Sequence, residues 1–304
     1  MRVHVRVPAS SANLGPGFDS LGLALALYNE VTAEEADGVR VKIEGDGAGR
    51  LAGNERNVVA RGVSAAYEAV GHRFRGCTLT CVNRIPLARG LGSSAAAWVG
   101  GLVAGNLLLG SPLDRSALLV LAARAEGHPD NVAAALFGGL TVSAGGTDGA
   151  IAVPLPVPGN LHWVALIPEI TSATSEARAV LPASVPREDA VFNVQRVALL
   201  LAALQAARFD VLGTALDDRL HQPYRVRLFP WLPAVADAAR KAGALGCVLS
   251  GAGPALLAVV AGAEGETVAR AMEEALSRAG VRGAARALAV DREGAVAAML
   301  SDSA

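Results

Sequence analysis

The sequence predicts an α+β fold with two sheets. Segments with alternating apolar residues are mixed with segments of helical periodicity, in an order that favours two sheets over one doubly wound sheet. The chain has 304 residues, 52% of them hydrophobic, which is enough for two domains of ordinary size. Gly145–Gly159 is rich in glycine and proline, and we interpret it as a loop and hairpin region near the domain boundary. We therefore expect an N-terminal domain over residues 1–155 and a C-terminal domain over residues 156–304.

The first half of the chain has the patterns of five strands and four helices. Alternation predicts strands at Val3–Val7, Gly22–Leu27, Val39–Glu44, Thr78–Val82 and Leu140–Ser143. Helical spacing predicts helices at Val58–Val70, Ser94–Leu109, Ser116–Ala125 and Asp130–Leu136. Pro129 suits the first position of the last helix, and Gly138 and Gly139 follow its end.

The second half begins and ends with a strand. Strands are expected at His162–Ile167, Gly246–Leu249, Leu256–Val260 and Ala284–Val290, with a tight turn at Ser250–Pro254. Helices are expected at Ser175–Leu181, Asp189–Ala206, Val211–Leu220, Leu232–Ala242 and Glu266–Ala279. These elements supply the second sheet.

The composition excludes several classes of protein. The net charge is −1, so no basic surplus points to nucleic acid, and no polybasic run points to anionic lipid. Lys42 and Lys241 are the only lysines. Neither follows a glycine, as a Walker-type P-loop requires, and neither lies in a setting typical of a Schiff base. We expect a small-molecule substrate, and neither nucleic acid nor a membrane as a partner.

The cysteines and the apolar segments predict a cytoplasmic protein. Cys77, Cys81 and Cys247 are odd in number, with no CxxC pair and no signal peptide, which indicates a reducing compartment. Met1–Pro8 alternates valine with arginine and histidine, as a strand does and a targeting sequence does not. Gly90–Leu113 has no charged residue, but its glycine, alanine and serine content favours a buried helix over a transmembrane one.

The segment Pro86–Ala97 places a glycine-rich turn directly before an alanine-rich helix. Backbone N–H groups converge in such a turn and the helix adds the positive end of its dipole, so a phosphate chain is the expected ligand. Ser93 and Ser94 either cap the helix or offer hydroxyls to phosphate or Mg²⁺. The turn can also be a plain connection. A dinucleotide-binding fingerprint fits it poorly, because Ala95 replaces the third glycine.

A second polar segment, Pro8–Gly22, gathers serines, Asn13 and Asp19 around two glycines in a turn after a strand. Such a turn can be merely solvated. It presents an amide and a carboxylate on one loop, however, and binding residues concentrate on loops of this kind.

A third polar segment, Glu126-Gly-His128-Pro-Asp130-Asn131, lies at a helix start. It brings two carboxylates, an imidazole and an amide within six residues. Asp130 can simply complement the helix dipole. Glu126 offers the carboxylate oxygen that Mg²⁺ prefers.

Arginines complete the candidate residues. Thr174 and Arg178 lie four residues apart and so share a helix face, and Arg225 ends Leu-His-Gln-Pro-Tyr-Arg. Each arginine can be a surface charge, but the two together can fork onto a carboxylate. Ser250–Ala255 is either a hairpin turn or a place where backbone approaches a ligand.

These segments, in this order, resemble the motifs of the GHMP kinases, the superfamily of galactokinase, homoserine kinase, mevalonate kinase and phosphomevalonate kinase. The three superfamily motifs are Pro8–Gly22, Pro86–Ala97 and Leu249–Leu257. The chain is most similar to the homoserine kinase branch. The marks of that branch are Pro-x-Ser-Ser-Ala-Asn-Leu-Gly-x-Gly-Phe-Asp, Glu-Gly-His-Pro-Asp-Asn, Thr-x-x-x-Arg and His-x-Pro-Tyr-Arg. The match runs over nearly the whole chain.

The resemblance implies the two-domain GHMP kinase fold, with a left-handed βαβ unit in the N-terminal domain and a ferredoxin-like C-terminal domain. It implies the cofactors ATP and Mg²⁺ and phosphorylation of the L-homoserine hydroxyl, a step of threonine biosynthesis. The nucleotide phosphates would lie over Pro86, Leu87, Ala88, Arg89, Gly90, Leu91, Gly92, Ser93, Ser94, Ala95 and Ala96. By the same resemblance, Ser94 and Glu126 would hold Mg²⁺.

The resemblance also assigns the acceptor site. Asn13, Asp19, His128 and Asp130 would surround the amino and hydroxyl ends of L-homoserine, and Thr174, Arg178 and Arg225 would take its carboxylate. This agrees with the chemistry of an amino acid, which needs anionic groups at one end and guanidinium at the other. Either Asp19 or Asp130 would orient the reacting hydroxyl. Family members commonly form dimers, so a homodimer is compatible with the sequence.

Some positions depart from the pattern of the branch. Gln222 stands where glutamate is common, and Ala255 where serine or threonine is common. Ala9 and Ser10 occupy the region in which other branches carry a lysine or arginine, which disfavours mevalonate kinase and galactokinase. Two alternatives stay open: a GHMP kinase with another hydroxylated acceptor, and a non-catalytic nucleotide-binding regulator.

Overall fold

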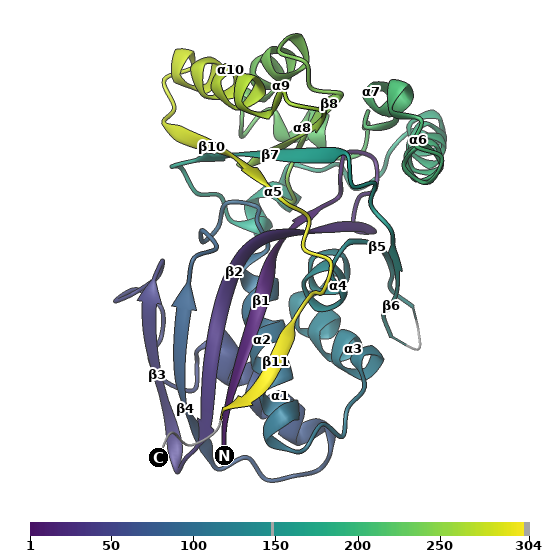
Figure 1. Cartoon of the computed structure of the whole chain (residues 1–304). Helices are drawn as coiled ribbons and strands as arrows, with labels where there is room; N and C mark the ends of the chain where they lie inside the picture. The colour runs from purple at the N-terminus through teal and green to yellow at the C-terminus, as the bar shows by residue number, and fades with distance from the viewer. Residues whose placement is uncertain (147–148, 301–304) are drawn as a thin grey trace.

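Figure 1 shows the computed structural model of the chain, which describes residues 1–146 and 149–300. Its strands form a seven-stranded sheet and a four-stranded sheet, each covered by helices. The prediction of an α+β fold with two sheets is therefore confirmed.

The larger sheet is built mainly from the first half of the chain. Its strands are β1 (Arg2–Ala12), β2 (Leu21–Glu35), β3 (Gly38–Gly45), β4 (Gly76–Asn83), β5 (Leu140–Ala144), β6 (Ile151–Leu155) and β11 (Val296–Leu300). The order is β11-β1-β2-β4-β3, and β5 pairs with the start of β2 and with β6. Only β3 and β4 are parallel, joined through α1 as a βαβ unit. The alternating valines of β1, at positions 3, 5 and 7, are fully buried.

Four helices accompany this sheet: α1 (Val58–Ala69), α2 (Ser93–Leu108), α3 (Arg115–Glu126) and α4 (Asp130–Phe137). Helices α2 and α4 pack directly on β1 and β2, and α1 packs along α2. Helix α2 is the uncharged segment in which the sequence favours a buried helix, and most of its residues are buried. In the described part of the chain, no helix combines the length and apolarity that crossing a membrane requires.

The smaller sheet has the order β10-β7-β9-β8, all antiparallel. Its strands are β7 (Leu161–Pro168), β8 (Gly246–Leu249), β9 (Leu256–Ala261) and β10 (Gly283–Leu288), and α9 (Leu232–Lys241) and α10 (Gly265–Arg278) cover one face. On the other face, Trp163 joins the same core as Leu200 and Leu204 of α6 (Arg187–Gln205). This is the βαββαβ arrangement of a ferredoxin-like fold.

The first motif contains more strand than the sequence indicates. Strand β1 passes a bulge at Pro8/Ala9 and continues to Ala12, so the turn of the Pro8–Gly22 segment is confined to its second half. Ser10 and Ser11 are fully buried in the strand, where Ser10 donates to Asn131 and Ser11 accepts from Ser250. These hydrogen bonds connect the first motif to the Glu126–Asn131 segment and to the third motif.

The helix predicted at Val211–Leu220 is wrong in its second half. The chain forms η1 (Phe209–Val211) and α7 (Leu212–Ala215), and then a separate short helix, α8 (Gln222–Arg225). The carboxylate of Asp218 accepts the N–H groups of Leu220, His221 and Gln222, which starts α8 in a new direction.

The sequence analysis missed β11, which follows the last predicted strand. It pairs antiparallel with β1 at the edge of the larger sheet. The boundary near residue 155 stays a prediction, and any division of the chain must give β11 to the sheet of the first half. The hairpin expected in Gly145–Gly159 is confirmed as β5–β6, and residues 147 and 148 of that segment lie outside the described residues.

Candidate active site

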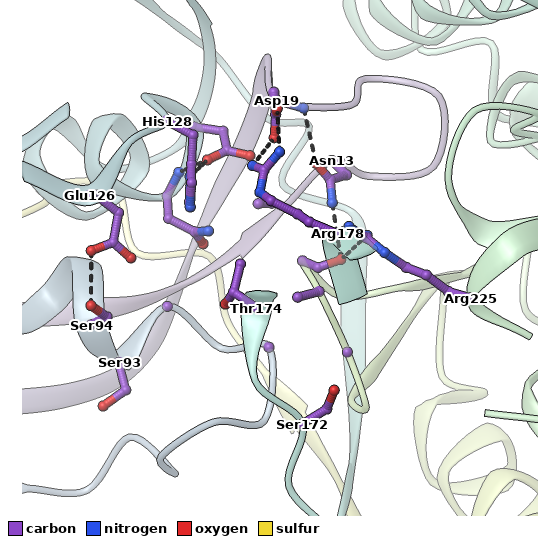
Figure 2. A pocket seen from close by; sticks show the side chains of 18 residues that line it. Asn13, Asp19, Ser93, Ser94, Glu126, His128, Ser172, Thr174, Arg178 and Arg225 are labelled. Carbon is purple, nitrogen blue, oxygen red and sulfur yellow. Dashed lines mark hydrogen bonds and ion pairs between the residues drawn. The ribbon is translucent and has the colours of Figure 1, made fainter. Parts of the chain in front are cut away.

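One pocket collects all the residues that the sequence assigns to the acceptor and the metal, together with four residues of the predicted phosphate segment Pro86–Ala96 (Figure 2). The predicted members are Asn13, Asp19, Gly90, Gly92, Ser93, Ser94, Glu126, His128, Asp130, Thr174, Arg178 and Arg225. The pocket adds Ala12, Asn131, Ser172, Gly251, Ala252 and Gly253. None of these was predicted individually, but all except Ser172 lie in segments that the sequence analysis singles out. The residues come from both halves of the chain.

The glycine-rich turn has a backbone that only glycine adopts without strain. Gly90 and Gly92 have φ of +78° and +69°. A Cβ on Gly90 would overlap the carbonyl oxygen of Ser250, and one on Gly92 would overlap the hydroxyl of Ser10. The turn is therefore packed closely against the first and third motifs.

The start of α2 offers unpaired main-chain donors to the pocket. Within the described residues, the N–H groups of Gly92, Ser93, Ser94 and Ala95 donate to no protein acceptor. The first N–H groups of a helix need such acceptors from outside, and the helix dipole favours an anion there. This corner of the pocket is suited to phosphate oxygens.

The other side chains of Pro86–Ala96 hold the turn in place. Leu91, Ala95 and Ala96 are buried in the core. Arg89 donates from Nε and Nη2 to the carbonyl oxygens of Pro168 and Glu169, at 2.9 Å each. The predicted phosphate contacts are thus left to the main chain and to the two serines.

A second pocket, which the sequence analysis missed, adjoins the first at the two serines, which line both. It is lined by Asn29, Ile43, Leu51, Ala52, Arg56, Asn57, Val58, Val59, Cys81, Asn83, Leu87, Ser93, Ser94 and Ala97. It is predominantly apolar and shares the start of α2 with the first pocket. The signal that could have found it is the glycine-dense segment Gly45–Gly53, which precedes the N-cap Asn57 of α1.

Ser94 and Glu126 are hydrogen-bonded to each other in the lining of the first pocket. The Ser94 hydroxyl donates to Oε2 of Glu126 at 2.8 Å. Burial raises the pKa of Glu126, and the hydrogen bond from Ser94 opposes that shift. A carboxylate that has lost part of its hydration gains from a nearby cation. Among the described residues no group of three or more His, Cys, Asp or Glu could hold a metal, so a cation here would share Glu126 and Ser94 with a ligand's oxygens.

His128 and Asp130 form a buried pair at the start of α4. Nδ1 of His128 lies 2.6 Å from Oδ1 of Asp130, and that oxygen also accepts the N–H of Asn131. Burial lowers the pKa of His128, but the hydrogen bond and charge of Asp130, with the charge of Glu126, outweigh it and leave the pKa above its ordinary value. The pair therefore favours the protonated imidazole.

Asp19 and Arg178 form a two-fold ion pair, although the sequence assigns them to opposite ends of a ligand. Arg178, on α5 (Thr174–Ala179), donates from Nη1 and Nη2 to the two carboxylate oxygens at 3.0 and 2.7 Å. Both side chains are more than a third exposed. Asn13 holds the Asp19 loop, because it accepts the Asp19 N–H and donates to the carbonyl oxygen of Gly251.

Arg225, in contrast to Arg178, is buried. It is 2% exposed, and it donates from Nε to the carbonyl oxygen of Ala177 and from Nη1 to that of Gly251. Burial, with the charge of Arg178, lowers its pKa to about 10. Its guanidinium is therefore fixed, positively charged at neutral pH, and poorly solvated.

The two departures from the branch pattern are structural in this chain. Oε1 of Gln222 accepts the N–H of Leu249 at 2.8 Å, and so fastens α8 to the end of β8, where the third motif begins. Ala255 is fully buried, and its N–H donates to the carbonyl oxygen of Arg89.

Comparison with known proteins places this site in a family. The family model described as the GHMP kinases N terminal domain matches residues 57–139, and the GHMP kinases C terminal model matches residues 200–280. A homoserine kinase of Moorella thermoacetica is 46% identical over 96% of this chain and 98% of its own length, and one of Carboxydothermus hydrogenoformans is 46% identical over 92% and 91%. A crystal structure of homoserine kinase from Cytophaga hutchinsonii superposes with a TM-score of 0.90, at 32% identity over 98% and 97% of the two chains. The chain belongs to the homoserine kinase family of the GHMP kinase superfamily.

Proposed function

We propose that this protein transfers the γ-phosphoryl group of ATP to the side-chain hydroxyl of L-homoserine, giving O-phospho-L-homoserine and ADP. One observation carries the proposal: the guanidinium groups of Arg178 and Arg225 and the carboxylates of Asp19 and Asp130 line one pocket beside the free amides of α2. An α-amino acid presents a carboxylate and an ammonium to such a pocket. Near-full-length relatives named homoserine kinase support this acceptor.

The nucleotide would use both pockets. Its phosphates would accept hydrogen bonds from the N–H groups at the start of α2. Its base and ribose would occupy the second, apolar pocket, which is also lined by Ser93 and Ser94. Glu126 and Ser94 are the residues that would hold Mg²⁺, which neutralises phosphate charge in such reactions. The desolvated carboxylate of Glu126 supports that role.

The chain's own contribution is placement. Phosphoryl transfer through a loose transition state needs little covalent help, so orientation and charge supply most of the rate. Asp130 is held by His128 and by the Asn131 N–H, and Asp19 is held by Arg178. Either carboxylate can accept a hydrogen bond from the acceptor hydroxyl, and no strong general base is required.

We infer a cytoplasmic location, where ATP and free amino acids are both present. The three cysteines are buried and unpaired, which is compatible with the reducing compartment expected from the sequence.

An ADP-release assay with Mg·ATP and a panel of acceptors tests the proposal. L-Homoserine should be phosphorylated with a kcat/KM at least about tenfold above those of serine, threonine and mevalonate. Serine and threonine carry the hydroxyl one carbon closer to the α-carbon, and mevalonate lacks the ammonium group. A preference for mevalonate would overturn the acceptor. ATP binding without turnover of any acceptor would instead favour a nucleotide-binding regulator.

A further inference from the structure

We propose that His221 is a positioning residue for acceptor recognition: its Nδ1 accepts a hydrogen bond from Nη1 of Arg225 and thereby aims Nη2 of that guanidinium into the pocket. The inference rests on the proposed function, because it takes Arg225 as the ligand of the acceptor carboxylate. His221 itself does not line the pocket.

The contacts of His221 determine which ring nitrogen carries the proton. Nε2 lies 2.7 Å from the carbonyl oxygen of Gly15 and 3.4 Å from Oδ2 of Asp218, whereas Nδ1 lies 3.0 Å from Nη1 of Arg225. A carbonyl oxygen can only accept, and an arginine can only donate. The ring is therefore neutral, with its proton on Nε2 and a lone pair on Nδ1.

The surroundings keep the ring neutral. His221 has no solvent-exposed surface. Burial is the largest influence on its pKa and lowers it. The charge of Asp218 opposes that shift and the charge of Arg225 adds to it, so that the pKa lies below its ordinary value. Protonation would place two donors against each other at Nδ1. Nδ1 of His221 can therefore accept the hydrogen bond from Arg225 throughout the neutral pH range.

The hydrogen bonds of Arg225 leave only one of its nitrogens for a ligand. A guanidinium has five N–H donors. The one on Nε is taken by Ala177, and the two on Nη1 are taken by Gly251 and His221. The two on Nη2 remain, and within the described residues they have no acceptor. Since Arg225 lines the pocket, these two are available to a carboxylate.

His221 is itself held from both halves of the site. Its ring stacks on Phe18, with centroids 5.3 Å apart and planes at 24°. Its backbone N–H donates to Asp218, whose carboxylate also accepts from Asn193. Gly15 and Phe18 belong to the same turn as Asp19. The imidazole of His221 therefore connects Arg225 to the turn that carries Asp19. In this way it fixes the relative positions of the cationic and anionic groups that would bind homoserine.

A packing role alone would depend on the ring and would not distinguish its two nitrogens. Two substitutions separate the roles of the two nitrogens. In His221→Asn, the new Oδ1 can take the position of Nδ1, so the hydrogen bond from Arg225 is kept and the one to Gly15 is lost. Gln in His221→Gln can reach Gly15 with its amide N–H, but it has no acceptor at the Nδ1 position.

Steady-state kinetics on the two variants tests the inference. His221→Gln should raise the KM for homoserine by about tenfold or more, the loss expected for a hydrogen bond to a charged group, with the KM for ATP unchanged. His221→Asn should keep the homoserine KM within about threefold of wild type, at a similar loss of thermal stability. Equal homoserine KM values in the two variants, or a change in melting temperature alone, would refute the role.

A measurement on the unmodified protein covers the case in which neither variant folds. The ¹⁵N chemical shifts of labelled His221 should report an unprotonated Nδ1 and a protonated Nε2 from pH 6 to pH 9. A protonated Nδ1 would contradict the inference. If wild-type protein does not phosphorylate homoserine, the proposed function fails first. If it does and the variants behave alike, only the role of His221 fails.

Discussion

The two sides of the pocket are built by different means. On the nucleotide side, the donors are main-chain N–H groups at the start of α2, in a turn whose glycines leave no room for a Cβ. On the acceptor side, the charged groups are side chains from four distant segments, represented by Asp19, Asp130, Arg178 and Arg225. A substitution disturbs a main-chain site only when it moves the backbone, whereas each group of a side-chain site can be removed by a single substitution. The difference predicts where substitutions act and on which substrate.

The largest effect is expected where the main-chain site is forced to move. Gly92→Ala places a Cβ against the Ser10 hydroxyl at a φ of +69°. The turn must shift, and a displacement of about 1 Å can lower activity about a hundredfold. We expect a loss of that order in kcat/KM for ATP, measured by coupled assay.

Gly71→Ala is the matched control for this substitution. Gly71 has the same φ of +69°, but an added Cβ meets nothing within 4 Å, and the residue lies at the end of α1, outside both pockets. It should lose about 1 kcal/mol of stability from backbone strain and keep its kinetic constants. Equal losses of activity in the two variants would mean that strain, not the position of the turn, matters.

The next effect is expected on the side-chain half. Arg225→Ala removes a buried guanidinium whose remaining N–H groups face the pocket, and a hydrogen bond between charged groups contributes about 1.5–3 kcal/mol. The KM for homoserine should rise roughly ten- to a hundredfold, with the KM for ATP unchanged. Arg225→Lys should recover little, because an ammonium cannot replace the three hydrogen bonds that fix this side chain. An unchanged homoserine KM would remove Arg225 from the site.

A smaller effect is expected at Arg178. Its side chain is 39% exposed and paired with Asp19, and solvent-exposed pairs contribute less than about 1 kcal/mol. Arg178→Ala should raise the homoserine KM by about two- to fivefold. Arg208→Ala, which breaks an exposed pair with Asp210 in another part of the molecule, should leave it unchanged. An effect at Arg178 as large as that at Arg225 would contradict the distinction between them.

The smallest effect concerns pH. The pKa of His128 is raised above its ordinary 6.5, against burial, by Asp130 and Glu126. The protonated ring therefore stabilises the fold fully below pH 6.5, and this contribution is lost as the pH rises through the folded-state pKa. Urea unfolding at pH values from 6 to 9 should show a decline in the free energy of unfolding that His128→Asn lacks. Parallel profiles for the two proteins would show that His128 does not couple to Asp130.

The comparison of the two sides also explains what the sequence could reveal. The glycine-rich turn before α2 is local, so Gly90, Gly92 and the helix that follows can be recognised in twelve consecutive residues. The acceptor residues carry no local mark of their partners, and they were found because four short motifs occur in the order of a known family. Even then the sequence does not indicate that Asp19 and Arg178, 159 positions apart, bond each other.

Elements that depend on distant pairing were the ones missed. Val296–Leu300 is a short apolar run, and it becomes strand β11 because β1 offers an edge to pair with. The apolar pocket beside Ser93 and Ser94 forms where the end of a glycine-dense loop meets α1 and α2. In the sequence, His221 is only a member of the segment Leu-His-Gln-Pro-Tyr-Arg, and its contact with Gly15 spans 206 positions. Such roles arise only when the fold brings the segments together.

A crystal structure with Mg²⁺, a non-hydrolysable ATP analogue and L-homoserine tests the central claim most directly. The phosphate chain should accept hydrogen bonds from the N–H groups of Gly92–Ala95, and the homoserine carboxylate should lie on Nη2 of Arg225. A triphosphate bound elsewhere, or a carboxylate that leaves Arg225 without contact, would contradict the division of the site into a main-chain half and a side-chain half.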